Sequence, residues 1–275
     1  MALDTVGLAA NAARDGSSGT ESAGRVADVL LRFLNGAETL GVSQLARDMA
    51  VSKAVVHRVL KTLSTRDLVQ FDAPTRQYKL GPAAAALGVR ALRDSDLRTT
   101  SLAHLASLNS HTGETVTLSG LVPGGRVYLD QIVSSHEIAM SVELGRRFPL
   151  YAGSSSKCIL AFMSLKEIER ILSEPLTALT SHTIVDSAAL IQELEVIRRR
   201  GFAVSDGERQ ENAGSVAAPV FGLDGAVVGA VSVCGPKFRV NAEFVRMAAP
   251  QVVEAAQAIS RSLGFDGQHR LDPKS

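Results

Sequence analysis

The chain has 275 residues, enough for two domains with separate hydrophobic cores. Hydrophobic residues make up 45% of it and charged residues 21%, proportions typical of a soluble globular protein. The chain contains no apolar run of about 18 residues and no basic start followed by an apolar stretch, which argues against a membrane span and a secretion signal. We therefore expect a cytoplasmic protein with no membrane partner.

The net charge of +1 is unevenly distributed along the chain. Residues 22–95 contain eleven Lys and Arg against six Asp and Glu, so the remainder is net acidic. A basic segment joined to an acidic one is typical of a DNA-binding domain attached to a second domain.

Cys158 and Cys234 have neither zinc-ligand spacing nor a disulfide framework, so we expect free thiols, no metal and no cofactor.

The first part of the chain predicts a disordered tail over 1–21 and a winged helix-turn-helix domain over 22–81. Apolar residues at helical spacing predict a first helix over 23–34. Ser43 and Ser52 are good helix N-caps and predict two more helices, with the helix-turn-helix at about 43–62. Two short apolar runs, 68–71 and 77–80, flank turn residues and predict a β-hairpin.

The second part of the chain predicts a mixed α+β domain. An Ala- and Leu-rich stretch gives a linker helix over 82–98 and then the first helix of a domain over 99–265, with a second disordered tail over 266–275. Within this domain we expect strands over 115–121, 126–133, 201–204, 215–221 and 226–233, and helices over 154–162, 166–173, 187–200 and 242–263.

The third helix, 53–64, carries the strongest local evidence for function. Val56, Val59, Leu60 and Leu63 form one apolar stripe, while Lys53, His57 and Lys61 are four residues apart on another face. Such a helix can pack on its domain while its cations meet phosphates and base edges of a major groove. The alternative is a solvated helix face without function. The residues predicted to contact DNA are Ser43, Gln44, Ser52, Lys53, Ala54, Val55, His57, Arg58, Lys61 and Arg76.

The run from Val42 to Leu60, VSQLARDMAVSKAVVHRVL, resembles the DNA-binding segment of IclR-family regulators. Tyr78 to Gly81 matches the way the wing of that family ends, and the likeness continues to Leu263. The resemblance implies a winged helix-turn-helix, a linker helix and a GAF-like α+β domain that binds a small, usually carboxylated metabolite. It also implies an effector-controlled transcriptional regulator and not an enzyme. We expect a repressor of a catabolic operon that is controlled by a small carboxylate-type effector: an aliphatic or aromatic acid, or a related amide.

Three stretches resemble the effector pocket of that family: 145–158, 201–208 leading into 214–220, and 231–236. The start of the helix at Gly153 and Ser154 offers backbone N–H groups and hydroxyls to a carboxylate. Ser232 and Cys234 are two apart on a strand and share a face. Leu144 is a further candidate for an apolar wall. The predicted effector residues are Met140, Gly153, Ser154, Ser155, Ser205, Asp206, Ser215, Ser232 and Cys234.

The chain departs from the family pattern in the predicted pocket. It has Ser205-Asp206 in place of two adjacent acids, Ser215-Val216 where a Cys is common, and Tyr151 where a His is common. The pocket is therefore shifted toward hydroxyls. In the alternative interpretation, the serines at 154–156 only cap a helix and Ser232 and Cys234 are small core residues.

Two other classes of function stay open in the sequence. Ser154 and Lys157 match the S-x-x-K motif of acyl-transferring enzymes, although the companion motifs S-D-N and K-T-G do not occur. Cys158 or Cys234 could instead serve a thiol redox sensor. The leading hypothesis predicts double-stranded operator DNA and a small molecule as partners. Because one short helix reads few base pairs, it also predicts a homodimer or a dimer of dimers, paired through Val29, Phe33 and the helix over 82–92.

Overall fold

The computed structural model describes residues 18–93 and 96–267. The chain divides into two compact units, one up to Asp94 and one from Ser95, and each is described by itself. The disordered tails predicted for 1–21 and 266–275 lie almost wholly outside the described residues, but residues 18–21 already belong to the first helix. Among the described residues, no helix is both long and apolar enough to cross a membrane.

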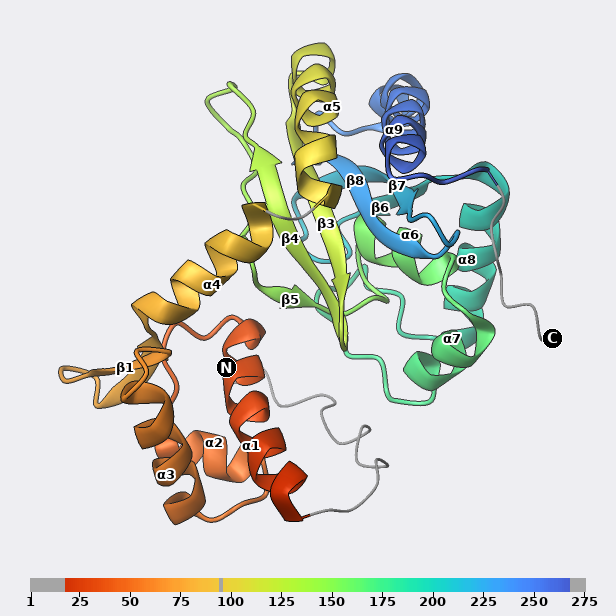
Figure 1. The fold of residues 1–275 in the computed structure, drawn as a ribbon. Helices are drawn as coiled ribbons and strands as arrows, with labels where there is room; N and C mark the ends of the chain where they lie inside the picture. The colour runs from red at the N-terminus through yellow and green to blue at the C-terminus, as the bar shows by residue number, and fades with distance from the viewer. Residues whose placement is uncertain (1–17, 94–95, 268–275) are drawn as a thin grey trace. The chain divides into compact units, whose positions relative to one another are not determined.

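The N-terminal unit consists of short helices followed by a two-stranded hairpin and a further helix. Its elements are α1 (Ser18–Arg32), the 3-10 turn η2 (Phe33–Asn35), α2 (Val42–Asp48), α3 (Lys53–Ser64), β1 (Val69–Asp72), β2 (Gln77–Leu80) and α4 (Pro82–Arg93), coloured red to light orange in Figure 1. The order of elements is the predicted one. The predicted cap of the second helix is wrong, because Gly41 and not Ser43 precedes the first helical residue of α2.

The core of this unit lies between α1, α2 and α3. Ser52 caps α3 by accepting a hydrogen bond from the Val55 N–H, and the apolar stripe predicted for this helix is buried. The residues packed in this core include Val29, Phe33, Leu45, Val56, Leu60, Leu63 and Val69. The stripe of α3 therefore faces inward, and its opposite side faces solvent.

Gly81 sets the path of the chain from the hairpin into α4. A Cβ at this position would lie 2.2 Å from the carbonyl oxygen of Asp67, so only glycine permits the approach. The Gly81 N–H donates to Leu68, and the Ala83 N–H donates to Asp67. These bonds hold the first turn of α4 against the base of the hairpin.

The C-terminal unit is built around a six-stranded antiparallel sheet with the strand order β5-β4-β3-β8-β7-β6. Its strands are β3 (Thr115–Val122), β4 (Gly125–Ile132), β5 (Arg147–Phe148), β6 (Ala203–Asp206), β7 (Ala213–Phe221) and β8 (Val227–Pro236). Its helices are α5 (Asp96–Thr112), α6 (Ser154–Ala161), α7 (Leu165–Leu172), α8 (Ser187–Arg200) and α9 (Ala242–Ser262). The sequence prediction missed β5, which has only two residues and no detectable alternation.

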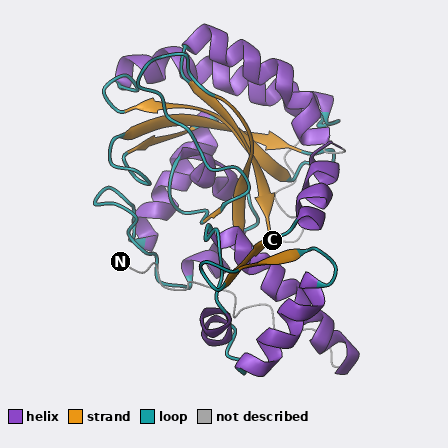
Figure 2. Ribbon diagram, turned by 90° about the vertical axis from the view of Figure 1, so that its left-hand side faces the viewer, coloured by secondary structure: helices purple, strands orange, loops and turns teal. Residues whose placement is uncertain are grey.

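Helices cover both faces of this sheet, which is strongly curved (Figure 2). On one face α5 and α9 pack against β3, β7 and β8 through a core that includes Leu105, Val231, Val252 and Ile259. On the other face α6, α7 and α8 form a second core around Ile159, Leu194 and Ala217. The unit is therefore an α+β domain with an antiparallel sheet between two helical layers.

A β-bulge between Leu118 and Ser119 decides which side chains of β4 share a face. Asp130 pairs with Leu118 and Tyr128 pairs with Ser119, so the strand carries one extra residue at this point. As a result Ile132 packs with the α5 and α9 core, whereas Arg126 and Tyr128 face the opposite side of the sheet.

Candidate functional site

The exposed side of α3 carries basic side chains that pair with none of the described acids. Lys53, His57, Arg58 and Lys61 are all exposed. Within residues 18–93 and 96–267, none of these four forms an ion pair. A helix buried on one stripe and positive on the other is able to lie in a major groove, with its cations close to phosphates.

The other residues predicted to contact DNA surround this helix on the N-terminal unit. Ser43, Gln44, Ser52 and Ala54 are exposed, and Val55 is half-buried. Arg76 is exposed in the turn between β1 and β2, where its φ of 56° shows a left-handed backbone. The turn between α2 and α3 is equally tight, with Ala50 at a φ of 52°. The Ala50 N–H donates to Arg47 and the Val51 N–H donates to Ala46, which closes that turn.

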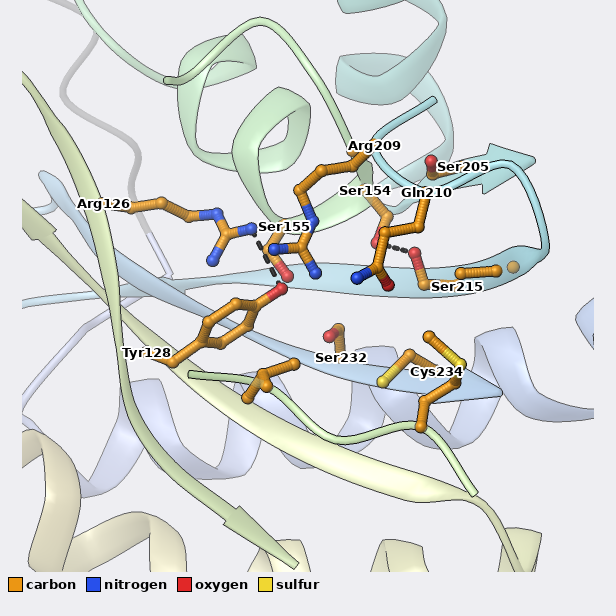
Figure 3. Close-up of a pocket in the computed structure, with 15 residues that line it drawn as sticks. Arg126, Tyr128, Ser154, Ser155, Ser205, Arg209, Gln210, Ser215, Ser232 and Cys234 are labelled. Carbon is orange, nitrogen blue, oxygen red and sulfur yellow. Dashed lines mark hydrogen bonds between the residues drawn. The ribbon is translucent and has the colours of Figure 1, made fainter. Parts of the chain in front are cut away.

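A cavity in the C-terminal unit lies between β4, β7, β8 and the start of α6, with an empty volume of about 460 Å³ that includes open solvent (Figure 3). It brings together eight of the nine predicted effector residues and leaves Asp206 outside. Asp206 is exposed and pairs with Lys237 at 2.9 Å. The lining residues are Arg126, Tyr128, Met140, Val142, Gly153, Ser154, Ser155, Ser205, Arg209, Gln210, Ala213, Gly214, Ser215, Ser232 and Cys234.

The start of α6 differs from the expected row of free N–H groups. Gly153, at a φ of 90°, donates its N–H to Glu208 Oε2 at 3.0 Å, so this donor is already occupied. The Ser154 and Ser215 hydroxyls are 2.7 Å apart, and the Ser232 hydroxyl lies 2.8 Å from that of Thr117. Three of the predicted hydroxyls thus form pairs with a neighbour, and each keeps hydrogen-bonding capacity for a ligand.

Two loop residues that form a wall of the cavity are held by side chains of the sheet. The Thr115 hydroxyl donates to the Met140 carbonyl at 2.6 Å. The amide of Gln131 both donates to and accepts from the Val142 backbone at 2.9 Å, as a neighbouring strand would. Leu144, proposed with Met140 as an apolar wall, is half-exposed and does not line the cavity.

Arg126 is the most unusual residue of the cavity, because its guanidinium is buried without an acid. Only 1% of the residue is exposed. Its Nε donates to Ser156 at 2.8 Å, its Nη1 to Ser119 at 3.1 Å and its Nη2 to Tyr128 at 3.1 Å. These partners are neutral hydroxyls, and no described acid forms an ion pair with Arg126. Burial is the main cause that lowers the pKa of this guanidinium, and the charge of Arg209 adds to the effect.

Arg209 approaches the same part of the cavity from the turn after β6. Its guanidinium carbon lies 4.4 Å from the centre of the Phe148 ring and 5.3 Å from that of Tyr128. Arg126 lies over the same two rings, at 5.3 Å and 4.3 Å respectively. The rings are 5.5 Å apart, edge to face, and stabilise both cations by cation–π contact.

The geometry argues against the two other classes of function. Lys157 is buried and its Nζ pairs with Glu208 and Glu193, so this nitrogen is not available as the general base beside Ser154. Burial raises the pKa of the Cys158 thiol and raises that of Cys234 to about 12. Because the thiolate is the reactive form, neither cysteine is primed for redox chemistry at neutral pH.

Sequence reasoning missed several lining residues, above all Arg126, Tyr128, Arg209 and Gln210. In the sequence, Arg126 and Tyr128 belong only to an alternating strand pattern, and Arg209 and Gln210 lie outside the stretches that resemble the effector pocket. The signal in the sequence is weak: an arginine is followed two residues later by a tyrosine, at the start of a strand that comes directly after a glycine turn.

Comparisons with known proteins agree with this geometry. Residues 22–73 match the family model described as "IclR helix-turn-helix domain", and residues 89–261 match "Bacterial transcriptional regulator IclR C-terminal". The chain belongs to the IclR family of bacterial transcriptional regulators. It is therefore a DNA-binding regulator from a family that is not enzymatic.

Relatives of this IclR-family chain match it over most of its length. The regulator BhcR of Paracoccus denitrificans (strain Pd 1222) is 31% identical over 92% of this chain and 91% of its own. The crystal structure of a putative IclR regulator from Silicibacter sp. TM1040 is 30% identical, with a TM-score of 0.80 over 88% of this chain and 96% of that one. An IclR homolog from Microbacterium hydrocarbonoxydans, complexed with 4-hydroxybenzoate, is 27% identical, with a TM-score of 0.69 over 88% and 98%.

Proposed function

We propose that this IclR-family protein is a cytoplasmic repressor of a catabolic operon that binds its operator through α3. The support is the exposed row of Lys53, His57 and Lys61, with Arg58 beside it and Arg76 at the tip of the wing. An electrophoretic shift with DNA from upstream of the neighbouring genes tests the binding. A reporter fused to the same promoter tests whether the protein represses or activates transcription, because deleting a repressor raises expression.

We further propose that a small carboxylate-type effector binds in the cavity of the C-terminal unit and controls operator binding. The observation that carries this proposal is Arg126, a buried guanidinium that lines the cavity and forms an ion pair with none of the described acids. Three of its five N–H groups bond to hydroxyls, which leaves two for a ligand. A buried charge is costly unless it is paired, so an acid in the cavity would supply the missing counter-ion. The bound 4-hydroxybenzoate of the Microbacterium hydrocarbonoxydans homolog is such an acid.

A thermal-shift screen of aliphatic and aromatic carboxylates, each beside its amide, tests the effector class. A ligand at a hundred times its Kd stabilises the folded state by about 2.7 kcal/mol, which raises the Tm measurably. We expect an acid that raises the Tm also to alter the operator shift, while its amide does neither. An amide that acts as well as its acid would contradict the proposal.

We also propose that the protein binds DNA as a homodimer or a dimer of dimers. The predicted surface has to be corrected, because Val29 is fully buried and Phe33 is 7% exposed, both in the core of the N-terminal unit. Of the predicted surface only α4 is available, with Leu87 64% and Val89 68% exposed. Apolar side chains so exposed are suited to pairing with a second copy. Light scattering that shows a monomer with unimpaired operator binding would refute this.

A further inference from the structure

Among the described residues, two arginines and no acid line the cavity. Arg126 and Arg209 both line it, while its other lining residues are uncharged. Figure 3 shows the two guanidinium groups converging above the Tyr128 ring, and both lie within 5.3 Å of the centres of the same two rings. Two positive charges are therefore held close together in a partly buried place, where like charges repel strongly.

The neighbouring acids are already engaged. Glu208 accepts hydrogen bonds from Lys157 and from the Gly153 N–H. Glu114 is bound by the guanidinium of Arg239. In the part of the chain that the structure describes, neither Arg126 nor Arg209 forms an ion pair. A molecule that enters the cavity would supply the compensating charge.

We propose that the effector carries two negative charges and that Arg126 and Arg209 bind them together. This inference rests on the proposed effector function and narrows its chemical class. A guanidinium binds a carboxylate or a phosphate through two parallel hydrogen bonds. A singly charged acid compensates one arginine and leaves the other beside it without a counter-ion. A dianion compensates both charges and removes their repulsion.

The hydroxyls of the cavity select the rest of the ligand. Ser154 and Ser215 come from the start of α6 and from β7, and Ser232 comes from β8. Their hydroxyls are uncharged and both donate and accept. They suit the neutral, polar part of a small molecule whose acid groups lie at the arginines.

Calorimetry on the full chain tests this charge requirement. Each probe is a dicarboxylate measured beside its half-amide, which has nearly the same shape and one charge fewer: succinate with succinamate, glutarate with glutaramate, and phthalate with phthalamate. We expect at least one diacid to bind about tenfold to a hundredfold more tightly than its half-amide, the usual effect of one charge-assisted hydrogen bond. Glycerol phosphate is a further probe. If it binds more tightly than every diacid, the paired charge is supported and a phosphate group is its source, which would contradict the carboxylate class.

The variant Arg209→Gln tests whether Arg209 binds the second negative charge of the effector. This arginine is only half-buried, so the variant should fold. It should bind the diacid no more tightly than the half-amide, while the affinity for the half-amide stays within about threefold of that of the parent. Arg146→Gln is the matched control: Arg146 lies 5.3 Å from the same Phe148 ring but pairs with Glu143 and does not line the cavity. It should leave both affinities unchanged.

The failures of the two proposals are distinguishable. If a half-amide or another monoacid binds as tightly as its diacid and alters operator binding, the dianion is refuted and the carboxylate effector stands. The same holds if Arg209→Gln keeps the full preference for the diacid. If only uncharged molecules bind and alter operator binding, both proposals are wrong.

Discussion

Lys157→Met should destabilise the C-terminal unit by about 3 kcal/mol, because breaking a buried ion pair costs about 3–5 kcal/mol. Lys157 is 2% exposed and binds Glu208, which is 8% exposed, and Glu193, which is 24% exposed. Methionine has a similar length and leaves Glu208 as a buried charge without its cation. The lower end of the range applies because Glu193 keeps contact with water and with Arg200. Effector affinity should fall as well, since Glu208 also holds the Gly153 N–H and directly precedes Arg209.

Urea denaturation followed by circular dichroism measures this loss. With a slope of about 2 kcal/mol per molar, 3 kcal/mol corresponds to a midpoint about 1.5 M lower. The double variant Lys157→Met with Glu208→Gln removes the unpaired charge and keeps an amide oxygen for Gly153, so it should recover part of the stability. If Lys157→Met shifts the midpoint by less than about 0.3 M, the pair is not structural. If the double variant is less stable than the single one, the explanation by an unpaired charge is wrong.

Three further predictions concern the cavity, the DNA surface and the thiols. Ser155→Leu adds bulk at the start of α6, so it should lower effector affinity more than about a hundredfold in calorimetry while keeping parental operator affinity. Ser232→Ala should show a milder loss of effector affinity. Unchanged effector affinity in Ser155→Leu would place the ligand elsewhere. Lys61→Ala should weaken binding to operator and random DNA alike and should reduce the slope of log affinity against log salt concentration by about one unit. Lys53→Ala should in addition change the sequence preference. If both variants bind DNA like the parent in electrophoretic shifts, the assignment of α3 is wrong. Because desolvation raises the pKa of Cys234 to about 12, its alkylation by iodoacetamide should be very slow at pH 7 and should still be rising at pH 9. A rate that levels off near pH 8 would contradict the raised pKa.

The sequence determined the features that depend on neighbours within one or two helical turns. The boundaries of α3 follow from the Ser52 cap and from a stripe of four apolar residues at helical spacing, both local properties. The hairpin after it follows from turn residues between two short apolar runs. The family likeness added the kind of cavity to expect in the second unit and named eight of its lining residues.

Tertiary structure decided where the charges of the C-terminal unit lie. Arg126 and Tyr128 share the cavity face by ordinary alternation, but a bulge between Tyr128 and Asp130 turns Ile132 to the opposite face, and an alternating pattern cannot show a bulge. Arg209 reaches the same rings from a turn 83 residues further along the chain. Lys157 finds Glu208 across 51 residues, and this pair occupies the Gly153 N–H that local reasoning left free. Charge compensation depends on distances in space, and only the folded sheet brings these groups together.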